Sequence, residues 1–194
     1  MNTRIHIVLT ALVLSIITPM TVFAQSLQVI GGQQQARDCY MAATIAAQMH
    51  SASREGIDVC SYALDEISMT TRDRVATLVN RGIIYVALEE YNKAVRDYDR
   101  AYKISPDIAE IHVNRGNLLF MSGHTEQAIA EYSQAIELKL TRQYVVYYNR
   151  GLAYEKLAEY NKAEADYRRA LELMPGWSHA QDKLDRLLNR TKKG

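Results

Sequence analysis

Hydrophobic positions recur at helical spacing over most of the chain beyond residue 36. Segments of about a dozen residues, with apolar side chains three or four positions apart, alternate with short polar turns such as Glu89-Glu90 and Ser122-Gly123-His124. Only nine glycines and three prolines interrupt the chain. The pattern predicts antiparallel helix pairs over roughly 37–67, 73–103, 109–138 and 144–173, followed by a helix near 177–190.

The helical part of the chain repeats itself with a period of 34 and then 35 residues. Asn80-Arg81-Gly82 returns as Asn114-Arg115-Gly116 and as Asn149-Arg150-Gly151. We expect the small residues to let paired helix backbones approach closely, and the tyrosines to fill the larger spaces. The second helix of each unit carries these residues at constant spacing: Ala94, Tyr98, Ala101; Ala128, Tyr132, Ala135; Ala163, Tyr167, Ala170.

These motifs resemble the tetratricopeptide repeat family, in the variety that carries Asn-Arg-Gly in its first helix. The resemblance covers residues 75–177 and implies an all-α, right-handed solenoid of antiparallel helix hairpins. Leu140 departs from the pattern, because a proline is expected at that position. We divide the chain into repeats at 75–108, 109–142 and 144–177, a degenerate hairpin at 37–70, and a capping helix with a tail at 178–194.

Residues 1–24 have the pattern of a secretory signal. Arg4 precedes a mostly apolar run over 5–17, Pro19 breaks it, and Val22-Phe23-Ala24 suits a signal peptidase. Cleavage after Ala24 would leave a periplasmic or secreted protein with a flexible leader at 25–36 and no segment that enters a membrane. The alternative is an uncleaved membrane anchor, although the apolar run is shorter than the ~20 residues needed to span a bilayer.

Charge and motif content narrow the function classes. Removing Arg4 from the 23 basic residues leaves 22, which balance the 22 acidic residues. This balance argues against a nucleic-acid partner, which requires a clustered basic excess. The histidines lack the spacing of metal ligands, and no nucleophile or phosphate-loop motif is present. We therefore expect no enzyme activity, no metal and no cofactor.

The two cysteines, Cys39 and Cys60, lie on opposite helices of the degenerate hairpin at heights that should face one another. In an oxidising compartment this arrangement favours a disulfide. A buried pair of free thiols is the alternative. A redox site is disfavoured because the Cys-x-x-Cys spacing is absent.

Each Asn-Arg-Gly arginine is followed, sixteen residues later, by an acidic residue on the paired helix. A structural ion pair inside every repeat explains this recurrence, and a ligand-binding role is the alternative. The predicted pairs are Arg81 with Asp97, Arg115 with Glu131, and Arg150 with Asp166.

The recurring asparagines Asn80, Asn114 and Asn149 are the candidate ligand-binding residues. In related families the equivalent asparagines line the concave groove and bind the backbone of an extended peptide, a task that suits an amide because it both donates and accepts. The alternative is that they only support the local fold. Helical spacing adds to the same inner face Val79, Ile83, Val86, Val113, Asn117, Phe120, Tyr148, Leu152 and Glu155.

The sequence thus predicts a protein-interaction scaffold that holds an apolar, extended or helical segment of another protein or peptide in its concave groove. The alternative is a structural subunit of an envelope assembly, held through its convex face or its ends, whose groove is filled by its own residues 25–35. Neither interpretation fixes the partner, and both leave a homo-oligomer open.

Overall fold

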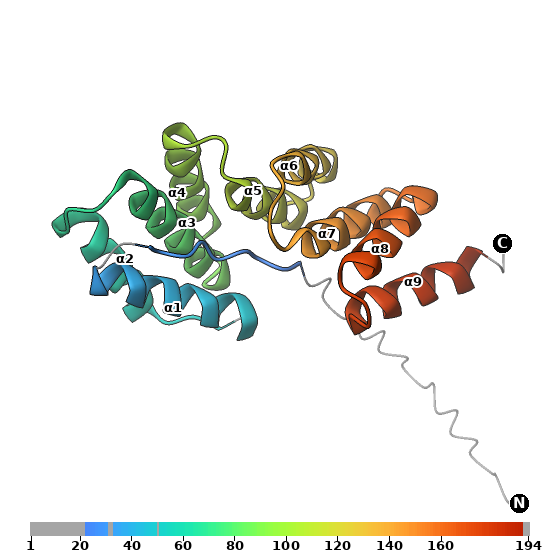
Figure 1. Cartoon of the computed structure of the whole chain (residues 1–194), viewed down its shortest axis with the longest axis horizontal. Coiled ribbons are helices and arrows are strands. Elements are labelled where there is room, and N and C mark those ends of the chain that lie inside the picture. The colour runs from blue at the N-terminus through green and yellow to red at the C-terminus, as the bar shows by residue number, and fades with distance from the viewer. Residues whose placement is uncertain (1–21, 31–32, 50, 192–194) are drawn as a thin grey trace, which may run out of the picture.

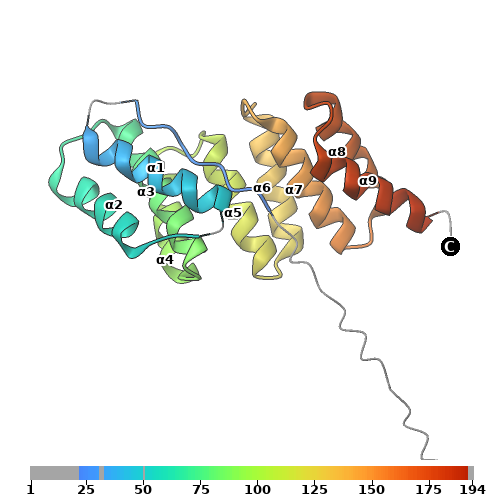
Figure 2. The same ribbon diagram turned by 90° about the horizontal axis from the view of Figure 1, so that it is seen from below.

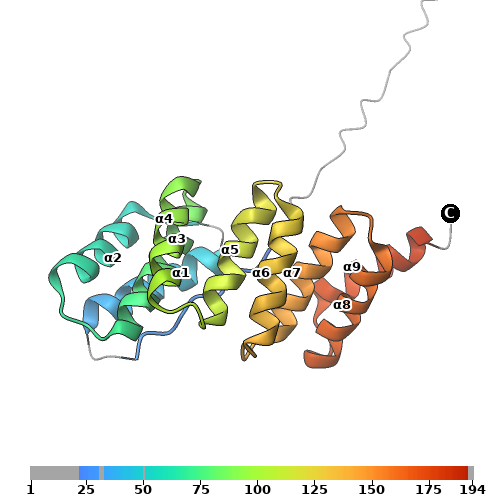
Figure 3. The ribbon, with the colours of Figure 1, turned by 90° about the horizontal axis from the view of Figure 1, so that it is seen from above.

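The computed structural model describes residues 22–30, 33–49 and 51–191, and every regular element within these ranges is a helix. The helices pair in sequence order and the pairs follow one another along the long axis of the molecule (Figures 1 and 3). This confirms the predicted all-α architecture of stacked hairpins. The helices are α1 (Gln34–Met49), α2 (Arg54–Glu66), α3 (Thr71–Ala87), α4 (Tyr91–Ile104), α5 (Ala109–Met121), α6 (Thr125–Glu137), α7 (Gln143–Lys156), α8 (Tyr160–Leu173) and α9 (Ser178–Thr191).

The turns inside the three later pairs share one backbone feature. Glu89, Gly123 and Ala158 occupy equivalent positions between the paired helices, with φ values of 60°, 85° and 59°. Only glycine adopts this left-handed region without a steric cost. Two of the three turns therefore carry a strained residue, and the turn after α5 does not.

The glycine of the Asn-Arg-Gly motif makes room for an aromatic ring. A Cβ atom added to Gly82 would lie 2.3 Å from Tyr98 Cε1, and the corresponding distance is 2.6 Å between Gly116 and Tyr132. Gly151 and Tyr167 repeat the arrangement at 2.7 Å. The tyrosine ring of the second helix therefore occupies the space at this glycine, and the ring packs between the two paired helices.

Cys39 on α1 and Cys60 on α2 form the predicted disulfide, with an S–S distance of 2.07 Å. Both residues are completely buried. The bond closes the first hairpin, whose helix α1 also packs against α3. Ser53 caps α2 by accepting a hydrogen bond from Gly56 N.

Residues 22–30, which we call the leader strand, form an extended segment that runs between α1 and α3 toward α7 (Figures 1 and 2). Its side chains alternate as in a β-strand: Gln25, Leu27 and Val29 are buried, whereas Gln28 and Ile30 are exposed. The expectation of a flexible leader over 25–36 is corrected here, because most of this segment packs into the fold and α1 already begins within it.

Within the part of the chain that the structure describes, no helix has both the length and the apolar character required to cross a bilayer. Of the predicted signal at 1–24, residues 1–21 lie outside the described residues.

Candidate peptide-binding groove

Asn80 on α3 holds the leader strand by its backbone. Leu27 N donates to Asn80 Oδ1 at 2.9 Å, and Asn80 Nδ2 donates to Leu27 O at 2.8 Å. The side-chain amide therefore satisfies both backbone groups of one residue, as a neighbouring strand would do in a sheet. Asn80 is completely buried, so these bonds are shielded from water.

Asn114 on α5 repeats this clamp two residues earlier in the leader strand. Gln25 N donates to Asn114 Oδ1 at 3.1 Å, and Asn114 Nδ2 donates to Gln25 O at 2.8 Å. The same Nδ2 group donates to Glu110 O at 2.9 Å, which fixes the amide against its own helix.

Asn149 on α7 forms the third clamp, again two residues earlier. Phe23 N donates to Asn149 Oδ1 at 3.2 Å, and Asn149 Nδ2 donates to Phe23 O at 3.1 Å. Asn117 Nδ2 adds a bond to Phe23 O at 3.0 Å. Tyr132 orients Asn117 by donating its hydroxyl to Asn117 Oδ1 at 2.9 Å, so the two amides and the phenol form one network.

The three asparagines therefore form a ladder with one rung per repeat. Each rung binds one residue, and successive rungs bind every second residue of the extended chain. An extended strand advances about 6.6 Å over two residues, so the repeat spacing and the strand spacing are matched along this path. Because each rung binds only backbone groups, the ladder does not depend on the identity of the bound side chains. Asp73 extends it by accepting from Ile30 N at 2.9 Å.

The ring of Phe23 lies against three aromatic side chains, which we call the aromatic seat. Its centroid is 5.6 Å from Tyr148 on α7, 5.4 Å from Trp177 and 5.1 Å from His179 at the start of α9. These separations are those of favourable tilted and edge-on aromatic contacts. The C-terminal helix thus does more than cover the last repeat, because its first turn completes a binding position for an aromatic residue.

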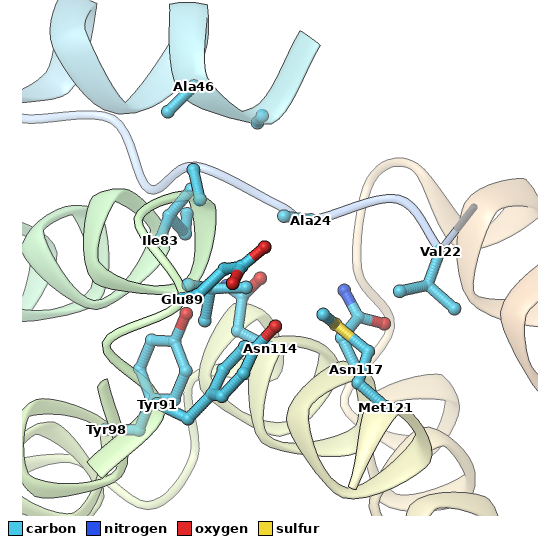
Figure 4. A pocket seen from close by; sticks show the side chains of 13 residues that line it. Val22, Ala24, Ala46, Ile83, Glu89, Tyr91, Tyr98, Asn114, Asn117 and Met121 are labelled. Atoms are coloured by element: carbon cyan, nitrogen blue, oxygen red, sulfur yellow. The ribbon is translucent and has the colours of Figure 1, made fainter. Parts of the chain in front are cut away.

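An open cavity of about 420 Å³ adjoins the leader strand (Figure 4). Val22 and Ala24 lie along one edge, while α1, α3, α4 and α5 supply the remaining walls. Its surface is mainly apolar, with Glu89 as the one acidic side chain among the lining residues. The groove therefore combines the backbone ladder with an apolar space beside the bound strand, and Asn114 and Asn117 border both. The remaining lining residues are Ala46, Ala47, Ile83, Val86, Ala87, Tyr91, Tyr98, Asn114, Asn117 and Met121.

Apart from Glu155, which accepts a hydrogen bond from Tyr167 and pairs with Lys183, the residues predicted for the inner face divide into two groups. Ile83, Val86 and Asn117 line the cavity, and Tyr148 contacts Phe23. The others are buried in the two hydrophobic cores and do not line the cavity, so their part in the site is to position the asparagine helices. This second group consists of Val79, Val113, Phe120 and Leu152.

Two of the arginines of the repeated motif form bidentate ion pairs with the acidic residues predicted for them. Arg81 Nε and Nη2 bind Asp97 Oδ2 and Oδ1 at 2.7 and 2.8 Å, and Arg150 binds Asp166 at 2.8 and 2.9 Å. Burial opposes the charge on Arg81, but the hydrogen bond and charge of Asp97 outweigh it and raise the pKa of Arg81. These pairs join the two helices of one repeat and do not touch the leader strand.

The middle repeat departs from this pattern. Arg115 Nε is 3.3 Å from Glu131 Oε1, while Glu131 Oε2 lies 2.7 Å from His112 Nδ1. The other ring nitrogen of His112 lies 2.8 Å from Pro106 O. Burial lowers the pKa of His112, but these two acceptors outweigh burial and raise it above its usual value. The sequence predicted the pairing of Glu131 with Arg115 but not the contact of His112 with the same carboxylate.

No group of three or more His, Cys, Asp or Glu side chains in the described ranges is placed to hold a metal ion. Three residues of the site were not predicted as such: Phe23 lies in the predicted cleavage site, and Trp177 and His179 lie at the predicted cap. Only the aromatic character of Phe23 and Trp177 signalled their contribution.

Comparison with known proteins identifies the repeated unit. Models described as tetratricopeptide repeat match residues 109–141 and 144–176, and one described as TPR repeat matches 82–123. The chain contains tetratricopeptide repeats. The matches to 109–141 and 144–176 cover the helix pairs that carry Asn114 and Asn149, and the match to 82–123 begins two residues after Asn80. All three describe a structural repeat and not a catalytic family.

Curated relatives match part of this chain and a small part of their own length. The human mitochondrial import receptor subunit TOM70 is 36% identical over 92 residues, which cover 42% of this chain and 15% of the receptor. The Hsp70-Hsp90 organizing protein of Triticum aestivum is 34% identical over 70 residues, covering 36% of this chain and 12% of that protein. The chain thus spans less than a sixth of the length of these two relatives.

Solved structures show the same fold. PilW, described as a widely conserved type IV pilus biogenesis factor, superposes with a TM-score of 0.68 at 23% identity over 81% of this chain and 70% of PilW. The Arabidopsis OM64 TPR domain gives 0.59 at 26% identity, over 62% of this chain and 99% of the domain. The first TPR of RPAP3, solved with an HSP90 peptide, superposes with a TM-score of 0.58 at 24% identity, over 61% of this chain and 93% of that domain.

Proposed function

We propose that this protein is an interaction scaffold whose tetratricopeptide groove holds an extended segment of another protein by its backbone. The asparagine ladder carries this proposal. Three buried amides, one per repeat, each satisfy the N–H and C=O groups of alternate residues in an extended chain. The leader strand shows the geometry of the bound segment, and a ladder that ignores side chains accepts other segments of the same shape.

The proposal includes two further points: the repeats are of the Asn-Arg-Gly variety, and the protein is exported. Asn-Arg-Gly in the first helix of each repeat supplies the ladder, and the signal-like pattern of residues 1–24 supports export to the periplasm or beyond. The disulfide between Cys39 and Cys60 is consistent with an oxidising compartment. The RPAP3 domain, which was solved with a bound peptide, supports a peptide ligand for this type of groove.

A second candidate function is a structural subunit whose groove is filled by its own leader strand. The observation that favours it is the burial of Leu27 and Val29 in the same core as α1 and α3. A tethered segment also competes at an effective concentration of about a millimolar. A partner that replaces the leader strand must therefore bind more surface than the ladder alone.

Photo-crosslinking in the intact exporting cell separates the two functions. A crosslinking residue at Met121, which lines the cavity, should capture a partner if the groove is used. Capture should be lost in Asn80→Ala/Asn114→Ala/Asn149→Ala, and it should persist when three exposed asparagines are changed, in Asn92→Ala/Asn161→Ala/Asn189→Ala. Capture from Met121 that is equally strong in both triple variants contradicts the ladder as the binding element.

Thermal melting of the same two triple variants provides the second readout. If the ladder serves only the internal leader strand, the groove variant loses stability and no capture is seen at Met121 even in the wild-type protein. That pair of results would support the structural subunit instead.

A further inference from the structure

Phe23 occupies its position as a bound ligand residue would. Asn149 holds both of its backbone polar groups, Asn117 holds its carbonyl a second time, and the aromatic seat of Tyr148, Trp177 and His179 surrounds its ring. No other leader residue is held by two asparagines and an aromatic cluster together among the described contacts. This is the most completely built position along the groove.

The predicted cleavage site falls immediately beside this position. Cleavage after Ala24 would keep Leu27 on Asn80 and Gln25 on Asn114, since both residues remain in the processed chain. It would remove Phe23, and with it the backbone partner of Asn149 and the ring that fills the aromatic seat. Processing therefore divides the groove into a self-filled half and an open half.

We propose that the processed protein uses this open half as a binding subsite for an extended segment of a partner protein that places an aromatic side chain in the aromatic seat. The inference rests on the proposed function and specifies which partners it selects. The ladder is indifferent to side chains, whereas the aromatic seat discriminates in favour of a ring.

The physical argument for reoccupation comes from burial. With Phe23 in place, Asn149 is completely buried and Asn117 is 5% exposed. Removal of Phe23 takes away the backbone partners of both amides and uncovers the apolar faces of the aromatic seat. An incoming backbone restores these bonds, while an aromatic ring restores the contacts with Trp177. Removal of Val22 and Ala24 also joins the subsite to the cavity that they border, so residues next to the ring meet an apolar wall.

Trp177 makes the subsite directly measurable, because it is the one tryptophan in the chain. The full-length gene is expressed with export, and intact mass gives the N-terminus of the purified protein. The probe is a C-terminally amidated peptide with the sequence of residues 19–24, titrated while Trp177 emission is followed. We expect a saturable change in emission, with binding about tenfold or more weaker when the phenylalanine of the peptide is alanine.

Protein variants supply the matched comparison. Asn149→Ala should weaken the peptide about tenfold through the loss of two hydrogen bonds, and Asn92→Ala, an exposed asparagine on α4, should leave binding unchanged. A melting curve shows whether Asn149→Ala is folded. If it is not, the alanine-substituted peptide decides the question on wild-type protein alone.

Three results would overturn this inference. They are a purified protein that retains Phe23, an absent Trp177 response, and equal binding of the phenylalanine and alanine peptides. Each leaves the Asn80 and Asn114 rungs untouched, so crosslinked capture that depends on the ladder would still uphold the proposed function. A working subsite without ladder-dependent capture would count against the proposed function and not against the subsite.

Discussion

Asn80 and Leu27 lie 53 positions apart in sequence and form two hydrogen bonds. The side-chain amide of Asn80 accepts from the backbone N–H of Leu27 at 2.9 Å and donates to its carbonyl at 2.8 Å. A helix surface normally offers no backbone groups to an extended strand, because its own N–H and C=O groups bond along the helix axis. The asparagine side chain supplies the missing donor and acceptor. The solenoid can therefore hold a strand without containing a sheet.

Asn80→Ala should lower the free energy of unfolding by about 2 kcal/mol, because it leaves two buried backbone groups of Leu27 without partners. Urea denaturation measures the change. Asn92→Ala, which removes an exposed asparagine, should stay within about 0.5 kcal/mol of wild type. Equal stability of the two variants would mean that the leader strand contributes nothing to the folded state.

Gly116→Ala should destabilise the protein by about 1–3 kcal/mol, since overpacking forces neighbouring side chains to move. The new Cβ would lie 2.6 Å from Tyr132 Cε1. The same substitution in a Tyr132→Leu background should cost clearly less, because the ring that it meets is gone. A double-mutant cycle by chemical denaturation gives the coupling energy, and a coupling near zero would exclude the ring as the reason for the glycine.

Ala158→Gly should stabilise the protein by about 0.5–1 kcal/mol, because relief of the left-handed strain exceeds the added entropy of the unfolded chain. Ala158 has φ of 59° in the turn between α7 and α8. Ala130→Gly, at an exposed position within α6, is the matched control and should destabilise by about 1 kcal/mol. The prediction fails if both substitutions change the melting temperature in the same direction.

The His112 and Glu131 contact should make stability depend on pH. The pKa of His112 is raised in the folded protein above its ordinary value of 6.5, so the folded state binds the proton more tightly than the unfolded chain does. Its contribution is fully present below pH 6.5 and is lost as pH rises through the folded pKa. The difference in melting temperature between wild type and His112→Gln should be larger at about pH 5.5 than at about pH 8.5. A difference in melting temperature that is larger at high pH than at low pH would contradict this prediction.

The repeat period and the helical spacing were sufficient to predict the stacked hairpins, because each helix carries its own apolar face and each small residue returns in register. The asparagines were recognised through the family resemblance. A leader bound in the groove was predicted only in the alternative interpretation, over residues 25–35, and the start of the strand at residues 22–24 and its extended register were not predicted. Its alternation of Phe23, Gln25, Leu27 and Val29 is short and includes a buried glutamine, and its pairing partners lie 53 to 126 positions away.

The aromatic seat escaped prediction for the same reason. Trp177 and His179 belong to the cap, Phe23 to the segment before the leader, and only the folded arc of the solenoid brings them together. His112 was a lone histidine in the sequence, because its acceptors Pro106 O and Glu131 lie on a turn and on a neighbouring helix.

One rung per repeat also sets how a bound strand leaves. Rungs spaced two residues apart can open one at a time from the Phe23 end, which lies away from α1, while those nearer α1 stay closed. A competing chain can take the first free rung as a toehold and advance by exchange, so the barrier is close to that of a single rung, about 1–3 kcal/mol, and not that of the whole ladder. Replacement of the leader strand then resembles branch migration between two nucleic-acid strands, and its rate depends on how many rungs the invader finds open at the start.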